Sequence, residues 1–223
     1  MMTRALKDPL YEQVARIGKA ISSPKRLELL EVLIQGDKTV DALAAELGID
    51  IRLASAHLKA LREARLVVAR RAGKNVIYRP SGADVAGLWV AVREVAEAHL
   101  VELRAALATI ADDPLHLVAL DRAALLAQAE RGEIVIIDVR PPDEYETAHL
   151  PYARSLPLAE IAQRLDELPR DRDIVAYCRG PFCLFADAAV RLLAPRGFRV
   201  RKLRDGVGEW QAAGLPVARA AAG

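Results

Sequence analysis

Two cysteines stand five positions apart, between a strand-like run and a helix-like run. Cys178 directly follows the strand-like residues 173–177, and Cys183 lies just before a helical stretch that begins near Phe185. In parallel α/β sheets, ligands bind beyond the carboxyl ends of the strands. Loop N–H groups and the N-terminus of the next helix attract anions. We therefore expect Cys178 to have a lowered pKa and to act as a nucleophile that carries a persulfide anion.

Cys183 places a second thiol in the same loop. Attack by Cys183 on a Cys178 persulfide releases sulfide and leaves a disulfide, and retention of the sulfur gives a trisulfide. A low-pKa cysteine beside a resolving cysteine is typical of redox sensors. Two alternatives stay open: an inert, structural Cys178, and a Cys183 that merely fills space and points off the loop. The other residues expected to form the anion cradle are Arg179, which alternatively faces solvent, and Gly180, Phe182 and Leu184.

The second half of the chain predicts the sheet that would position these thiols. Strand-like runs alternate with helical stretches, which indicates an α/β fold with parallel strands. At the end of the first strand, Asp138 and Arg140 are expected to form a structural polar pair rather than to act in catalysis. The predicted strands are 133–139, 173–177 and 199–203, and the predicted helices are 121–130, 159–167 and 185–193.

The first third of the chain has the pattern of a helix-turn-helix followed by a β-hairpin. Thr39 and Asp50 are placed to cap two short helices, and Gly48 ends the first of them. The β-type runs 66–71 and 76–79 flank a glycine-containing turn and form a wing. A long helical pattern then covers residues 83–111. The helices expected before the wing are 9–21, 24–36, 40–47 and 51–64.

Basic and polar side chains on this pattern are suited to DNA. Residues 1–80 contain 15 Lys and Arg against 9 Asp and Glu, whereas the whole chain has a formal net charge of +2. On the second short helix, polar residues lie away from the apolar stripe and can read bases in the major groove. Basic residues of the wing can reach phosphates, although each one is alternatively a solvated charge. The expected DNA-binding residues are Arg52, Ser55, His57 and Lys59 on the helix, and Arg70, Arg71 and Lys74 on the wing.

Residues 113–223 resemble the rhodanese domain. Beyond the Tyr177–Gly180 segment, the matching residues are Ile137–Arg140, Glu144, Tyr145, His149–Pro151, Ala153, Leu203, Asp205, Gly206, Trp210 and Gly214–Val217, while Ala148 and Tyr152 stand where glycine is usual. The resemblance implies a sulfurtransferase that carries persulfide on Cys178. In thiosulfate-using members the six-residue loop usually closes with arginine, and here Cys183 takes that position. Thiosulfate is therefore a doubtful substrate, because the cation that holds a dianion is missing.

Residues 8–111 resemble the ArsR family of winged-helix repressors. The resemblance rests on Ser55–Lys59, on Leu61–Val67 and on a wing that ends in Tyr78-Arg79; Arg65 replaces a usual glycine. It implies a homodimer that binds double-stranded operator DNA, with the helix at 83–111 and the first helix at the dimer seam. The alternative for the long helix is packing within one chain.

Metal sensing, which is common in that family, is not expected here. The helix 40–47 has no cysteine for a thiolate site. His99 and Glu102 have a ligand-like spacing, but Ala86 stands where a histidine should accompany Asp84. We therefore expect no metal and no cofactor.

Composition and charge complete the prediction. A chain with 52% hydrophobic and 28% charged residues is neither disordered nor fibrous, and its longest apolar runs are far shorter than a membrane helix. With no apolar signal region at the start, a cytoplasmic protein is expected. The predicted fold class is α/β overall, with an all-α winged helix-turn-helix domain at 1–112 and an α/β rhodanese-like domain with a mostly parallel sheet at 113–223.

These observations predict a transcriptional regulator, most simply a repressor, that senses reactive sulfur through Cys178 and Cys183. Its partners would be operator DNA, a second copy of the chain, small sulfur donors such as polysulfide, thiosulfate or persulfides, and thiol acceptors; no membrane is involved. The alternative is a sulfurtransferase enzyme whose DNA-binding domain only controls its own expression. A metal-responsive repressor with an accessory sulfurtransferase is a third, weaker interpretation.

Overall fold

The computed structural model describes residues 2–110, 118 and 121–220. The chain divides into two compact units, Met1–Trp89 and Val90–Gly223. Helix α5 (Asp84–His99) begins in the first unit and ends in the second. The predicted domain boundary at 112–114 lies outside the described residues. Among the described residues, no helix is long and apolar enough to span a membrane.

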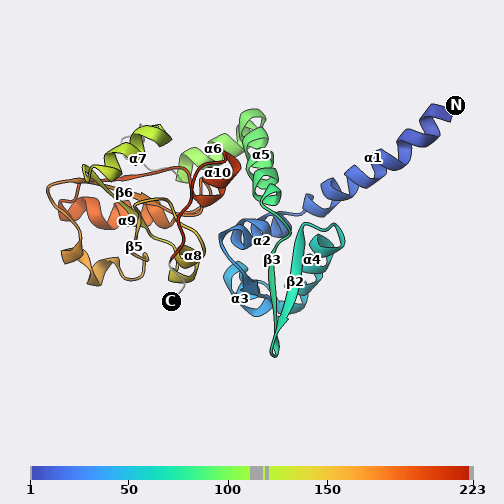
Figure 1. Ribbon diagram of the computed structural model, residues 1–223, viewed down its shortest axis with the longest axis horizontal. Helices are drawn as coiled ribbons and strands as arrows, with labels where there is room; N and C mark the ends of the chain where they lie inside the picture. Colours follow the sequence, from blue (N-terminus) through green and yellow to red (C-terminus); the bar gives the residue numbers. More distant parts are fainter. Residues whose placement is uncertain (1, 111–117, 119–120, 221–223) are drawn as a thin grey trace. The chain divides into compact units, whose positions relative to one another are not determined.

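The first unit consists of helices and a small antiparallel sheet (Figure 1). Both predicted helix caps form: Thr39 accepts the N–H of Ala42, and Asp50 accepts the N–H of Arg52. Capping satisfies N–H groups that the first helical turn leaves without a partner, so it fixes where these two helices begin. The elements are α1 (Met2–Ile21), α2 (Pro24–Gln35), β1 (Lys38–Thr39), α3 (Val40–Leu47), α4 (Ile51–Glu63), β2 (Val67–Ala72) and β3 (Asn75–Pro80).

The predicted wing is the hairpin of β2 and β3. Val67 pairs with Pro80 and Ala72 with Asn75, which leaves Gly73 at the turn with a φ of +61°. The strand β1 pairs with the other edge of β3. With two residues, β1 is too short to leave a periodic pattern in the sequence. The core beneath the hairpin is made of leucines from three helices: Leu29, Leu30, Leu33, Leu43, Leu58 and Leu61.

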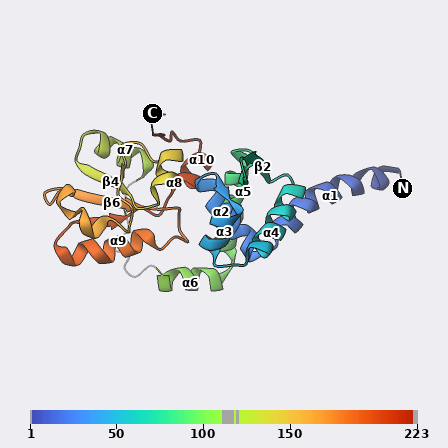
Figure 2. The ribbon, with the colours of Figure 1, turned by 90° about the horizontal axis from the view of Figure 1, so that it is seen from below.

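The second unit contains a four-stranded parallel sheet in the order β5-β4-β6-β7. Helix α9 covers one face and α7 the other (Figure 2). Successive strand residues alternate between these two cores, because side chains in a strand point to opposite faces. The elements are α6 (Val101–Ile110), α7 (Arg122–Glu130), β4 (Ile134–Asp138), α8 (Pro142–Thr147), β5 (Arg154–Ser155), β6 (Asp173–Tyr177), α9 (Phe185–Leu193), β7 (Val200–Lys202) and α10 (Val207–Ala212).

Three predicted helices differ from the structure. The first helix, predicted at 9–21, begins seven residues earlier, at Met2. The pattern at 83–111 is not one helix but α5 and α6, separated at Leu100. The Arg104 guanidinium donates to the carbonyl oxygens of Glu97 and Ala98, which a continuous helix would offer to its own backbone N–H groups. The predicted helix at 159–167 is a pair of 3₁₀ turns, Ile161–Gln163 and Leu165–Glu167. Its start is held against the sheet because the N–H of Leu158 donates to the carbonyl of Val139.

Candidate functional site

The cysteine loop lies where the sequence places it, between the end of β6 at Tyr177 and the start of α9 at Phe185. A turn closes inside it, with the N–H of Cys183 donating to the carbonyl of Gly180 at 3.1 Å. Gly206 packs closely against the backbone of this loop. A Cβ on Gly206 would lie 2.5 Å from the carbonyl oxygen of Cys178 and 2.5 Å from the carbonyl carbon of Arg179. Only glycine fits there without moving the loop.

The two thiols have different surroundings. Cys178 is 2% exposed, whereas Cys183 is partly exposed, and both are free cysteines. Burial raises the pKa of the Cys178 thiol well above its usual range. The Cys178 thiol donates to the carbonyl oxygen of Cys183 at 3.4 Å. Interaction with this neighbouring thiol lowers the pKa of Cys183, and N–H groups of Arg179 and Phe185 and the charge of Arg179 act in the same direction. The expected lowering of the Cys178 pKa is therefore wrong, because burial outweighs the N–H groups around that thiol. The lowered pKa belongs to Cys183 instead, mainly because of its interaction with Cys178.

Backbone N–H groups do surround the two sulfur atoms. Those of Ala186 and Gly180 face Cys178 and favour its anion, while those of Arg179 and Phe185 face Cys183. The side chains of two loop residues whose N–H groups are expected in the cradle lie away from the thiols. The guanidinium carbon of Arg93 lies 5.8 Å from the centroid of the Phe182 ring. The side chain of Leu184, which flanks the start of α9, is exposed.

Arg179 faces a carboxylate rather than solvent. Its Nε donates to Glu144 at 3.0 Å, and a second contact of 2.5 Å joins its Nη2 to the same fully buried carboxylate. The Arg179 guanidinium also lies 5.7 Å from the ring of Phe185 at the start of α9. The positive charge is thus held beside the loop, where it favours a thiolate on Cys183.

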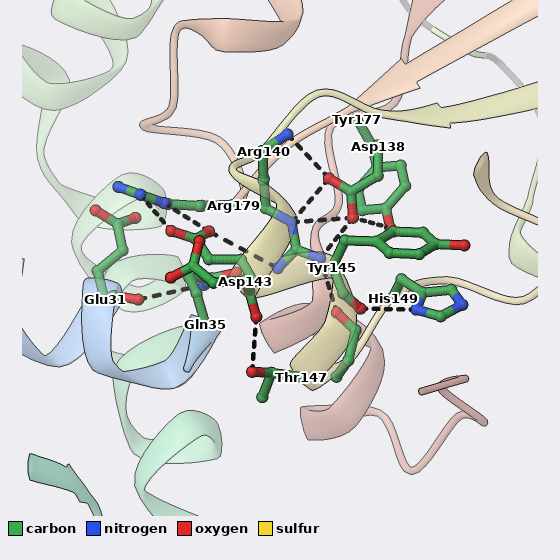
Figure 3. A network of polar contacts seen from close by, with 12 residues as sticks. Glu31, Gln35, Asp138, Arg140, Asp143, Tyr145, Thr147, His149, Tyr177 and Arg179 are labelled. Carbon is green, nitrogen blue, oxygen red and sulfur yellow. Dashed lines mark hydrogen bonds and ion pairs between the residues drawn. The ribbon is translucent and has the colours of Figure 1, made fainter. Parts of the chain in front are cut away.

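Behind the loop, Asp138 and Arg140 form a fully buried ion pair (Figure 3). The carboxylate of Asp138 also accepts the hydroxyl of Tyr177 at 2.5 Å, and that same hydroxyl accepts the N–H of Leu150 at 3.1 Å. Arg140 donates further to the carbonyl of Ala148 at 2.7 Å. Every group has a partner, so the cluster stabilises the strand ends next to Cys178, which agrees with a structural role.

Sequence reasoning missed four residues that shape this site: Glu144, Gly206, Glu209 and Arg93. Glu144 and Gly206 were recognised only as parts of a motif. Glu209 accepts the N–H of Gly206 and forms an ion pair with Arg93. Glu209 and Arg93 both lie against the cysteine loop at Gly180. No pattern in the sequence links Arg93 to residues more than 80 positions away.

The predicted DNA-binding residues lie on α4 and the hairpin of the first unit. Arg52, Ser55 and Lys59 are exposed on α4, and His57 is half-buried. The opposite side of α4 is buried through Ala54, Leu58 and Leu61. On the hairpin, Arg70, Arg71 and Lys74 are exposed. Arg70 lies 3.6 Å from Asp37 and Lys59 lies 3.9 Å from Glu63, so each of these two cations already has a nearby carboxylate.

The candidate metal residues lie on the surface. His99 and Glu102 are both exposed, at the end of α5 and the start of α6. Within the part of the chain that the structure describes, no three His, Cys, Asp or Glu side chains gather as ligands would.

Comparison with known proteins agrees with both halves of the chain. Residues 23–68 match the family model described as "Bacterial regulatory protein, arsR family", and residues 121–213 match that of the rhodanese-like domain. The HTH-type transcriptional regulator Rv0324 of Mycobacterium tuberculosis is 46% identical over 211 residues, which cover 95% of this chain and 92% of that protein. The chain belongs to the ArsR family of regulators and carries a rhodanese-like domain.

Two further relatives each match one half of this ArsR–rhodanese protein. A sulfurtransferase of Allochromatium vinosum is 35% identical over 89 residues, 40% of this chain and 82% of the relative. The biofilm growth-associated repressor of Xylella fastidiosa is 36% identical over 87 residues, 39% of this chain and 76% of the relative. The predicted fold class, an N-terminal winged helix-turn-helix with a C-terminal parallel α/β domain, is confirmed.

Proposed function

We propose that this ArsR-family regulator is a cytoplasmic, homodimeric repressor that takes sulfane sulfur as a persulfide on Cys178 and responds to reactive sulfur through Cys178 and Cys183. The observation that carries the proposal is a pair of free thiols, one buried and one partly exposed, in one amide-lined loop on the same chain as a DNA-binding unit. A relative named as a sulfurtransferase and another named as a repressor support the two halves.

The loop geometry suggests how the two thiols divide the work. The Cys178 thiol donates a hydrogen bond to the carbonyl oxygen of Cys183 at 3.4 Å, which holds it beside the Cys183 sulfur. The Cys183 thiolate takes the proton of Cys178 as Cys178 attacks. The Cys178 thiolate then bonds to the sulfane sulfur of a donor R–S–SH, and the donor's S–S bond breaks. The products are Cys178–S–SH and R–S⁻, which takes up a proton to become R–SH.

A second step resolves the persulfide. Cys183 loses its proton again, and its thiolate attacks the Cys178 sulfur. The bond between Cys178 and the transferred sulfur breaks, HS⁻ leaves, and a Cys178–Cys183 disulfide forms. Two thiols are oxidised and one sulfane sulfur is reduced to sulfide, so electrons balance without another oxidant.

The homodimer is supported by apolar side chains on the surface. Leu6, Leu10 and Val14 of α1 repeat every four residues and are each at least 66% exposed. This half of α1 extends beyond the other helices of its unit (Figure 1). A contiguous apolar stripe on a soluble surface indicates a protein contact, and a second copy of the chain supplies the matching stripe.

Operator binding tests the proposal. The reduced protein selects its operator from a pool of random DNA. The affinity is then measured at fixed salt, before and after polysulfide treatment, for the wild type, Cys183→Ser and Cys178→Ser. We expect the wild-type affinity to change by about tenfold or more, and Cys183→Ser and Cys178→Ser to remove this change. Unchanged wild-type affinity, with sulfur still loaded on Cys178, favours the alternative of a sulfurtransferase with an autoregulatory DNA-binding domain.

A further inference from the structure

A cavity of about 230 Å³ opens beside the two cysteines. Cys178 and Cys183 lie in its wall, and all of its lining residues belong to the second unit. Leu107 and Ala108 of α6 and Leu203 after β7 also line it. Its volume is that of roughly eight water molecules, which is smaller than most pockets for drug-sized ligands. The part of a sulfur donor that this cavity can hold therefore has few atoms.

The two cations of the cavity are each matched by a carboxylate. Lys202 forms an ion pair with Asp187, and both side chains are largely buried. Arg204 forms an ion pair with Glu97 of α5. The two cations and two carboxylates cancel, and position 183 holds a thiol. Neither Lys202 nor Arg204 therefore offers a positive charge that its carboxylate does not already balance. A dianion such as thiosulfate would lose its hydration in the cavity without gaining such a charge, which is unfavourable.

We propose that this cavity binds the carbon portion of a small organic hydropersulfide whose R group is short and carries no net charge, and that it delivers the sulfane sulfur to Cys178. This inference rests on the proposed persulfide chemistry and adds the class of donor. The R group packs against Leu107, Ala108 and Leu203, while the sulfane sulfur lies at the amide-lined loop. The transfer is the balanced one given above, in which R–SH leaves.

The test compares three donors with the full-length protein. Ethyl hydropersulfide, glutathione hydropersulfide and thiosulfate are each mixed with the reduced protein, and the rate at which Cys178 gains one sulfur atom is followed by mass spectrometry. We expect ethyl hydropersulfide to react at least about tenfold faster than the other two, because it alone is both small and uncharged in its R group. Equal rates for the three donors would overturn the inference.

Two variants test the wall and the charges. Ala108→Leu narrows the cavity and is expected to slow ethyl hydropersulfide about tenfold relative to inorganic hydrogen disulfide, which has no R group. Ala105 is an exposed alanine of α6 like Ala108 but does not line the cavity, so Ala105→Leu is the matched control. Glu97→Gln leaves Arg204 without its carboxylate, so the ratio of the thiosulfate rate to the ethyl hydropersulfide rate should rise about tenfold.

The outcomes separate this inference from the proposed function. If no donor, including inorganic hydrogen disulfide, loads Cys178, persulfide chemistry itself is refuted. If hydrogen disulfide loads Cys178 but Ala108→Leu and Ala105→Leu behave alike, the chemistry stands and the donor class is wrong.

Discussion

Arg93 of α5 and Glu209 of α10 form an ion pair of 2.6 Å in which the side chains are only 3% and 5% exposed. Glu209 also accepts the N–H of Gly206 at 2.6 Å. A Cβ on Gly180 would lie 3.0 Å from Glu209 and 3.3 Å from Arg93, so the pair touches the back of the cysteine loop. Because α5 begins in the first unit, this pair joins the loop to a helix that both units share.

Breaking this pair should uncouple the loop from α5. Arg93→Met leaves the Glu209 carboxylate buried without its cation, and we expect the free energy of unfolding of the second unit to fall by about 3–5 kcal/mol. In the folded protein, the change of operator affinity on sulfur loading should shrink to less than about twofold. Denaturant unfolding and operator titration measure the two effects.

Arg131→Met is the matched control for Arg93→Met. It breaks the Arg131–Glu133 pair, whose side chains are more than half exposed, so the free energy of unfolding should stay close to that of the wild type. Arg93→Lys keeps the charge and should retain part of the coupling. A folded Arg93→Met protein that still responds fully to sulfur would show that α5 is not the coupling element.

The unequal acidity of the two thiols predicts the order in which they react. Because the pKa of Cys183 is lowered and that of Cys178 is raised, thiolate appears on Cys183 first as the pH rises. At about pH 7, limiting iodoacetamide should label Cys183 in preference to Cys178. Peptide mapping by mass spectrometry reports the order.

Removing the Cys178 thiol should reverse part of the lowering of the Cys183 pKa. Cys178→Ala takes away the thiol that stabilises the Cys183 thiolate, so the pKa of Cys183 rises and its labelling at about pH 7 slows by about tenfold. Cys178→Ser retains a hydroxyl donor and should slow it less. Preferential labelling of Cys178 in the wild type would contradict the assigned order.

The sequence predicted most of the fold but only part of the site, and the reason differs between the two. Strands β4 and β6 are short, strongly apolar runs, and the caps Thr39 and Asp50 act within three residues, so local pattern determines them. The acidity of Cys178 depends on how deeply it is buried, which no local pattern gives.

Contacts between residues far apart in the sequence were also not predicted. Arg93 and Glu209 meet only after both helices have packed, so neither residue type nor spacing indicates the pair. The break at Leu100 was likewise hidden, because the apolar pattern of α5 and α6 continues across it.

Gly206 predicts how sensitive the loop is to its support. In Gly206→Ala, the new Cβ overlaps the backbone of Cys178 and Arg179, so the loop must shift although the backbone conformation of Gly206 is open to alanine. We expect sulfur loading of Cys178 to slow by about tenfold or more, since small displacements of reacting groups cost this much.

The control for Gly206→Ala is Gly87→Ala. A Cβ on Gly87 of α5 meets nothing within 4 Å, and alanine favours a helix, so loading should continue at the wild-type rate. Equal loading rates in Gly206→Ala and the wild type would mean that the loop tolerates the shift.

The wing and α4 should contribute differently to DNA binding. Arg71→Ala removes an exposed cation from β2, so it should weaken binding to operator and random DNA alike and reduce the slope of log affinity against log salt by about 1. Arg52→Ala on α4 should instead weaken binding to the operator more than binding to random DNA. The difference between the two binding free energies should shrink by about 1–3 kcal/mol. Fluorescence anisotropy at several salt concentrations distinguishes these results, and an identical loss of specificity in both variants would contradict the assignment.

Arg65 adopts a left-handed conformation, with a φ of +62°, at the turn between α4 and β2. Its N–H donates to the carbonyl of Arg62 at 2.9 Å, and the N–H of Leu66 donates to the carbonyl of Leu61 at 3.0 Å. This pair of bonds ends the helix with a left-handed residue, so the turn itself requires the conformation of Arg65. A non-glycine residue is destabilised by about 1–2 kcal/mol there, and glycine offsets part of the gain through its greater freedom in the unfolded chain. Arg65→Gly should therefore raise the free energy of unfolding of the first unit by about 0.5–1 kcal/mol.

The matched variant for Arg65→Gly makes the opposite change. Gly48 has a φ of +60°, and a Cβ on it would meet nothing within 4 Å, so Gly48→Ala adds backbone strain without a clash and should cost about 1 kcal/mol. Thermal unfolding of the first unit should show the midpoint rising by about 2–8 °C in Arg65→Gly and falling by about 4–8 °C in Gly48→Ala. If Arg65→Gly unfolds at a lower temperature, contacts of the Arg65 side chain outweigh its backbone strain.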